Sequence, residues 1–245
     1  MAPPTLEILA YEPTPLGLLC LRRREVPGAP GTSVTEITLD HEFLMSSLLT
    51  ASEEALARRA VVRHAGDALD VLVGGLGLGY TAHAALGSAR VARVEVVELL
   101  PQVIDWLARD LVPLAGALKA DRRLVVTQGD VYARLLAPPA RTHDLILIDV
   151  DHSPDEPLAR GDATPADGFH GVDFHGVGFH GVGGLARAKR HLAPGGVLAV
   201  WSSAESSPFV DALRRTFASV EAEPITVENP LIDETQTDWL FFARD

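Results

Sequence analysis

Four short apolar runs in the middle of this 245-residue chain each end on a glycine-rich turn or on a carboxylate. The first run ends at Val73 and leads into the turn Gly74-Gly75-Leu76-Gly77-Leu78-Gly79. The other three end on or just before Glu98, Asp130 and Asp149. Apolar runs of about four to eight residues with such boundaries are typical of buried strands in a parallel sheet. Ligands of such sheets bind outside the carboxyl ends of the strands, so the pattern predicts where a site lies.

Helix signals separate these runs, and the alternation predicts a doubly wound α/β sheet that is mostly parallel. Strands are expected over residues 68–73, 93–98, 124–127, 144–149 and 197–201. Helices are expected over 50–64, 79–86, 101–111, 131–136, 183–191 and 208–217. Thr50-Ala51-Ser52-Glu53 is a capping-box pattern, which predicts that the Thr50 side chain caps the first helix. The last two strands, near 220–227 and 237–243, predict an antiparallel hairpin at the sheet edge.

The first part of the chain has a different pattern. Apolar and β-branched runs near 6–11, 16–23 and 34–39 are separated by turns rich in Pro and Gly. They predict a small antiparallel β domain over residues 1–50, followed by one larger domain over 51–245.

Composition excludes several classes of function. There are 21 basic and 33 acidic residues, so the formal charge is −12, and a protein this acidic is a poor partner for nucleic acid. Cys20 is the only cysteine, which rules out an internal disulfide or a thiolate metal cluster. No apolar run approaches the ~18 residues of a membrane span, and the first residues do not resemble a secretory signal. We expect a cytoplasmic protein that does not associate with membranes.

The turn and the first two acids match the needs of an adenine nucleoside. Glycines let the backbone pass close to a ligand, so Gly74, Gly75, Gly77 and Gly79 are predicted to bind it. Their spacing departs from the strict dinucleotide fingerprint, which disfavours NAD.

The two acids have separate roles in this interpretation. Glu98 lies 23 residues after Gly75, where a carboxylate can accept hydrogen bonds from ribose hydroxyls. Asp130 can accept the exocyclic amine of adenine, or cap the helix that follows it, or do both. Val131, next to it, is placed in the same site.

Asp149, Asp151 and His152 are predicted to form the reacting end of the site. A carboxylate at this point of the sheet can bind a substrate ammonium and take its proton, and it attracts a cationic sulfonium. The alternative for the acids is loop capping. His152 is either a base near neutral pH or a loop residue.

Residues 150–183 contain a tandem repeat of Phe-His-Gly-Val, with histidines at 170, 175 and 180. Histidine-rich tracts can bind metals, but a five-residue spacing suits neither a helix face nor a strand face. The repeat therefore favours a duplicated flexible loop, and no metal is expected.

Taken together, these motifs resemble the spermidine synthase family, the aminopropyltransferases. The resemblance rests on the N-terminal β domain, the glycine turn and three segments: Val94-Glu95-Val96-Val97-Glu98, Gly129-Asp130 and Asp144-Leu145-Ile146-Leu147-Ile148-Asp149. It implies a Rossmann-like sheet of the class I methyltransferase type. It also implies that Glu98 holds the ribose, that Asp130 contacts adenine, and that Asp149 helps to deprotonate an attacking amine. Residues 150–183 would be a gatekeeper loop, and the protein a homodimer or tetramer.

The chain departs from that family at three places. Gly77 stands where the family's turn carries an aspartate, and its lack of a side chain leaves room for the carboxylate of S-adenosylmethionine. Asp149-Val150-Asp151-His152-Ser153-Pro154 replaces the family's Asp-Ser-Ser-Asp-Pro, and residues 41–47 replace its Tyr-His-Glu segment.

The sequence therefore predicts a spermidine-synthase-like transferase with a cationic amine as acceptor. Its donor would be either decarboxylated S-adenosylmethionine or S-adenosylmethionine itself. A methyltransferase and a catalytically inactive nucleoside-binding protein stay open as alternatives.

Overall fold

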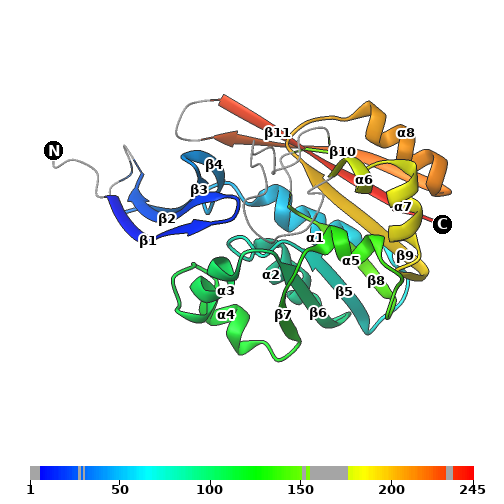
Figure 1. The fold of residues 1–245 in the computed structure, drawn as a ribbon, viewed down its shortest axis with the longest axis horizontal. Coiled ribbons are helices and arrows are strands. Elements are labelled where there is room, and N and C mark those ends of the chain that lie inside the picture. Colours follow the sequence, from blue (N-terminus) through cyan, green and yellow to red (C-terminus); the bar gives the residue numbers. More distant parts are fainter. Residues whose placement is uncertain (1–5, 27–28, 30, 151–152, 155–175, 230–233) are drawn as a thin grey trace.

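The computed structural model describes residues 6–26, 29, 31–150, 153–154, 176–229 and 234–245, which form two sheets and their covering helices (Figure 1). The N-terminal strands are β1 (Leu6–Thr14), β2 (Gly17–Glu25), β3 (Ser33–Leu39) and β4 (Glu42–Ser46). The elements that follow are α1 (Ala51–Arg63), β5 (Leu69–Gly74), α2 (Tyr80–Leu86), β6 (Val91–Glu98), α3 (Pro101–Ala108), α4 (Ala115–Ala120), β7 (Leu124–Gln128), α5 (Val131–Leu136) and β8 (His143–Ile148). The last are α6 (Gly176–Phe179), α7 (Val182–Lys189), β9 (Leu192–Ser202), α8 (Ser207–Thr216), β10 (Ser219–Asn229) and β11 (Glu234–Arg244).

The four N-terminal strands form an antiparallel sheet in the order β1-β2-β3-β4. Three of them confirm the predicted strands, but the sequence did not predict β4. A two-residue turn joins β3 to β4, and both of its residues, Asp40 and His41, have positive φ (47° and 71°). Such turns usually carry Asn-Gly or Asp-Gly, so the Asp-His pair gave no signal. Asp40 also stabilises the neighbouring hairpin, because its Oδ1 accepts the Leu18 N–H at 2.6 Å.

The larger sheet confirms the predicted fold class. Its strand order is β10-β11-β9-β8-β5-β6-β7; the strands from β9 to β7 are parallel, and β11 and β10 form an antiparallel hairpin at the edge. The chain adds β6 and β7 on one side of β5, then crosses to add β8 and β9 on the other side. The point of reversal between β5 and β8 is where ligands bind in sheets of this kind.

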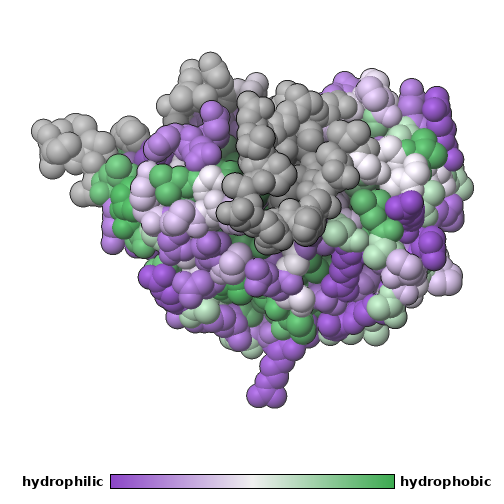
Figure 2. Space-filling view, viewed as in Figure 1, coloured by the Kyte–Doolittle hydropathy of each residue, from purple (hydrophilic) through white to green (hydrophobic). Residues whose placement is uncertain are grey.

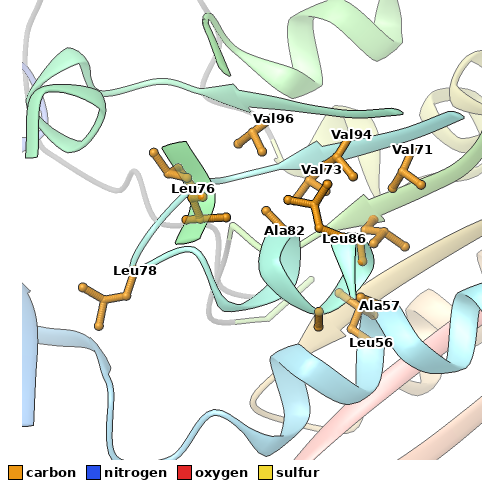
Figure 3. Close-up of a cluster of buried hydrophobic side chains, with 14 of the residues drawn as sticks. Leu56, Ala57, Val71, Val73, Leu76, Leu78, Ala82, Leu86, Val94 and Val96 are labelled. Atoms are coloured by element: carbon orange, nitrogen blue, oxygen red, sulfur yellow. The ribbon is translucent and has the colours of Figure 1, made fainter. Parts of the chain in front are cut away.

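Two layers of helices cover this sheet because its strand side chains alternate between two hydrophobic cores. Residues of α1, α2, α3 and α4 pack on one face, and residues of α5, α6, α7 and α8 pack on the other. Figure 3 shows α2 between α1 and the strands β5 and β6. The side chains that meet there are Leu56, Ala57, Val71, Val73, Ala82, Leu86, Val94 and Val96. This packing holds α1 firmly at the sheet, which matters for the site because the first turn of α1 reaches its carboxyl edge.

The helix expected over 101–111 is shorter than predicted. It ends at Ala108, and Asp110 has a φ of 61°, a left-handed conformation that an α-helix cannot continue through. Leu111 therefore lies outside the helix, and a separate helix, α4, follows. The sequence did not predict α4, whose six residues are too few to show a clear periodicity.

The capping-box prediction is wrong. Thr50 is the N-cap residue of α1, but its side chain makes no capping hydrogen bond. Its hydroxyl lies 3.2 Å from a carboxylate oxygen of Glu54 instead. Glu53, the residue expected to bond back to Thr50, is buried against the sheet.

The surface of the N-terminal sheet carries exposed hydrophobic side chains. Leu6, Ile8, Tyr11 and Phe43 are each more than half exposed, and hydrophobic colouring gathers over this sheet at the left of Figure 2. The homo-oligomer expected from the sequence stays a prediction. Among the described helices, none combines the length and the apolar character needed to cross a bilayer.

Candidate functional site at the carboxyl edge of the sheet

Backbone hydrogen bonds bring the predicted segments together at one edge of the sheet. The Gly75 N–H donates to the Val97 carbonyl at 2.9 Å, and the Asp149 N–H donates to the Gly74 carbonyl at 3.0 Å. The Gly129 N–H, just before Asp130, donates to the Glu98 carbonyl at 2.9 Å. The glycine turn and the three acids that follow it in the sequence are thus neighbours in space, around the point where the strand order reverses.

Position 75 requires glycine because of its backbone conformation and because no side chain would fit there. Its φ is +89°, and a Cβ there would lie 2.3 Å from the Asp149 carbonyl oxygen. The turn therefore sits directly against the residue predicted to do the chemistry. Any side chain at this position would push the two apart.

Gly77 is crowded from another direction. Its φ is +50°, and a Cβ would lie 2.6 Å from the sulfur of Met45, which comes from β4 of the N-terminal sheet. The same sulfur accepts the Leu78 N–H at 3.3 Å. A thioether thus lies against the turn at the place where the family that the sequence motifs resemble carries an aspartate.

Glu98 is buried, and backbone amides surround its carboxylate. Oε2 accepts the Leu76 N–H and Oε1 accepts the Leu100 N–H, each at 2.8 Å. Burial raises the pKa of this carboxyl, while amide hydrogen bonds from Leu100, Leu76, Gly77 and Leu99 oppose the rise. In this arrangement the carboxylate holds the glycine turn in shape. Its contact with a ribose stays a prediction.

Asp130 caps α5, which was one of the two roles that the sequence allowed. Its Oδ1 accepts the Tyr132 N–H at 2.8 Å and the Ala133 N–H at 3.1 Å. Val131 is buried beside it, and its methyl groups lie 2.8 and 2.9 Å from where a Cβ of Gly74 would be. Both residues thus support the turn and the helix behind it, and their contact with adenine stays a prediction.

Asp149 directly follows β8 and is partly buried. Its Oδ2 accepts a hydrogen bond of 2.5 Å from the hydroxyl of Thr81 on α2. Burial and the charge of Asp238 raise its pKa to about 6, against the effect of the Thr81 hydrogen bond. A carboxyl that titrates near neutral pH suits proton transfer.

Sequence reasoning missed two acids of this site, Glu53 on α1 and Asp238 on β11. Ser52 lies between them: its Oγ is 2.6 Å from Asp238 Oδ2 and 3.0 Å from Glu53 Oε2, and it accepts the Trp201 indole N–H at 2.9 Å. Ser52, Glu53 and Asp238 are all buried. Burial, and then the charge of Asp149, raises the pKa of Glu53 to about 8.

Among the described residues, no basic side chain neutralises this group of acids. In the part of the chain that the structure describes, no Arg, Lys or His forms an ion pair with Glu53, Asp149 or Asp238. Burying a charge without a partner is costly, so such an arrangement favours either protonation or a bound cation. No group of three or more His, Cys, Asp or Glu side chains within the described ranges is arranged to hold a metal ion.

Two predicted site residues, Asp151 and His152, lie outside the described residues, as do His170 and His175. The last copy of the repeat is described and does not form a loop. Phe179, at the end of α6, is fully buried and stacks against Tyr132 with ring centroids 4.7 Å apart. His180 is buried too and meets the ring of Phe209 edge to face at 5.3 Å. This copy is part of the core beneath the site, contrary to the flexible loop expected there.

No protein-family model and no curated protein sequence matches this chain. Solved structures do. The spermidine synthase of Thermotoga maritima matches with a TM-score of 0.69 over 97% of this chain and 72% of its own, at 13% identity. A spermidine synthase in complex with the transition-state analogue AdoDATO matches with the same TM-score and coverages, at 14% identity. The resemblance predicted from the sequence motifs is confirmed as a shared methyltransferase-like fold.

Proposed function

We propose that this chain is a spermidine-synthase-like transferase that moves a group from an S-adenosyl nucleoside to an amine. The observation that carries the proposal is the position of Asp149. It lies at the carboxyl end of β8, against the glycine turn, beside Glu53 and Asp238, with no basic partner among the described residues. The spermidine synthase that binds AdoDATO has this fold.

Asp149 would act by proton removal. The acceptor enters as an ammonium, which the acidic group attracts, and the ionised Asp149 carboxylate takes one of its protons. The free amine then attacks a carbon bonded to the donor sulfonium. As the new C–N bond forms, the C–S bond breaks, and its electron pair neutralises the sulfur. The protein would contribute mainly position and the site of the proton.

The glycine turn would hold the donor nucleoside, with Glu98 and Asp130 at its ribose and adenine. The chain's own role there is to keep the backbone of residues 74–79 open to a ligand, through glycine conformations and the Glu98 hydrogen bonds. With decarboxylated S-adenosylmethionine as donor, the transferred group would be aminopropyl.

A methyltransferase is the second candidate, and the contact between Met45 and Gly77 favours it. Within the described ranges, the side chain that meets this point of the turn is the neutral thioether of Met45, which does not repel the carboxylate of S-adenosylmethionine. The transferred group would then be methyl.

Calorimetric titration with S-adenosylmethionine, its decarboxylated form and methylthioadenosine tests these assignments. Preference for the decarboxylated form supports aminopropyl transfer, and preference for S-adenosylmethionine supports the methyltransferase. If none of the three binds, the nucleoside site is wrong. If a donor binds but no amine is ever modified, as judged by product mass, the chain is an inactive nucleoside-binding protein.

A further inference from the structure

We propose that Glu53 is a neutral acid in the resting site, where its carboxyl O–H donates to Ser52 Oγ, so that two carboxylates rather than three face the acceptor. The inference rests on the proposed function for its role in the reaction. Its physical content, the location of one proton, does not depend on that function.

The hydrogen bonds of Ser52 carry the argument. A serine hydroxyl has one hydrogen to donate and two lone pairs to accept with, whereas an indole N–H can only donate. Trp201 Nε1 occupies one lone pair at 2.9 Å. The single hydroxyl hydrogen can satisfy only one of the two carboxyl groups that lie within hydrogen-bond distance. The other carboxyl makes a hydrogen bond to Ser52 only if it brings a hydrogen of its own.

The neighbours of the two carboxyls decide which one is protonated. Asp238 accepts on both oxygens: Oδ2 is 2.6 Å from Ser52 Oγ, and Oδ1 accepts the Gln236 amide at 2.9 Å. Hydrogen bonds that a carboxyl group accepts favour its ionised form, and the contact of Ser52 with Asp238 is the shorter of its two carboxyl contacts. Glu53 is left as the donor, at the longer distance of 3.0 Å.

The charges around Glu53 point the same way. The charges of Asp149 after β8 and Asp238 on β11 act on Glu53, and the charge of Glu53 acts on Tyr80 of α2; none of these groups is basic. Glu221 and Glu223 on β10 are already paired with Arg59 and Arg63, further along α1. Burial and the charge of Asp149 together raise the pKa of Glu53 to about 8, so the proton is retained at neutral pH.

The consequence for the reaction lies in Asp149. A neutral Glu53 adds no negative charge beside the base, so the pKa of Asp149 is raised by burial and by the charge of Asp238 instead. Glu53 is thus a positioning residue: it fixes Ser52 and Trp201 without hindering the ionisation of Asp149. Two variants separate these effects. Glu53→Gln removes no charge near Asp149, whereas Asp238→Asn does.

The experiment is a carboxyl ¹³C NMR titration of the full chain labelled at Asp and Glu, from pH 4 to pH 10, without ligand. We expect the Glu53 resonance to titrate near pH 8 and Asp149 near pH 6. Glu53→Gln should leave the Asp149 midpoint in place, and Asp238→Asn should move both midpoints to lower pH. Glu54→Gln is the control, because Glu54 is on the same helical turn but pairs with Arg58.

The outcomes distinguish the inference from the proposed function. If Glu53 titrates near its ordinary pKa, or if Glu53→Gln lowers the Asp149 midpoint, the proton is not on Glu53 and the inference fails. If Glu53 titrates near pH 8 but no donor or amine reacts, the inference stands and the proposed function fails. If Glu53→Gln does not fold, the titration of the wild type and of Asp238→Asn still shows whether Glu53 carries the proton.

Discussion

The same sheet carries two groups of buried or partly buried acids, and they have opposite surroundings. Glu95, in the middle of β6, bonds to Arg134 at 2.7 Å and to Arg93 at 3.2 Å. Beside it, Asp70 pairs with Arg141 and with Nδ1 of His143. At the carboxyl edge, Glu53, Asp149 and Asp238 have no basic partner among the described residues.

The difference separates structural acids from candidate functional ones. An acid surrounded by arginines is satisfied within the fold, and removing one partner leaves a poorly compensated charge. At the carboxyl edge, burial raises the pKa values of Glu53 and Asp149, and acids without a cationic partner can exchange protons or bind a cation. Four substitutions test this contrast, beginning with the largest expected effect.

Asp149→Asn should abolish turnover while the protein stays folded. Loss of a general base lowers rates by about 10²- to 10⁴-fold, and an amide cannot take the ammonium proton. The measurement is product formation from an S-adenosyl donor and an amine, alongside calorimetry of donor binding. Asp105→Asn, at an exposed site on α3, is the matched control. Undiminished turnover in Asp149→Asn would remove this residue from the mechanism.

Gly75→Ala should disrupt the same edge although every acidic side chain stays in place. A positive-φ residue that is not glycine costs about 1–3 kcal/mol, and the new Cβ would also collide with the Asp149 carbonyl. Gly195→Ala is the control, since its φ is +77° but no atom lies within 4 Å of its Cβ position. Urea unfolding should show the larger loss for Gly75→Ala, together with loss of donor binding. Equal losses would mean that the close approach to Asp149 is unimportant.

Arg134→Ala should reduce stability and leave turnover unchanged. Glu95 would lose its shortest ion pair, and a hydrogen bond to a charged group contributes about 1.5–3 kcal/mol. Arg214→Ala, which removes an exposed pair with Asp211 at 3.8 Å, should cost almost nothing. A fall in turnover at constant donor affinity would show that the two groups of acids are coupled.

Glu53→Gln should remove a loss of stability that the wild type shows as pH rises, and this is the smallest of the four expected effects. Because the folded pKa of about 8 lies above the ordinary 4.5, the folded state binds more protons than the unfolded state between these values. Wild-type stability therefore falls as pH rises through this window, by about 1 kcal/mol between pH 7 and pH 8. The variant has no such titration. The measurement is thermal unfolding of both proteins at pH 7 and pH 8. An equal loss of stability in the wild type and the variant would contradict the prediction.

Much of the fold follows from the sequence. The spacing of apolar runs, glycines and prolines predicted the central parallel strands, most helices and the terminal hairpin, because these signals are local. The failures were local too. Asp40-His41 forms a turn that usually needs glycine, and Asp110 ends a helix whose apolar pattern continues to Leu111.

For the candidate site, the sequence predicted the location of several residues but not the charge of their surroundings. That the glycine turn, Glu98, Asp130 and Asp149 lie together could be predicted because each stands at the end of a strand, and parallel strands bring their carboxyl ends to one edge. Only the tertiary structure decided the charge of that edge. Glu53 looked like part of a helix cap and Asp238 like an ordinary strand residue, 185 positions apart. A raised pKa comes from burial and from neighbours in space, and a linear sequence encodes neither directly.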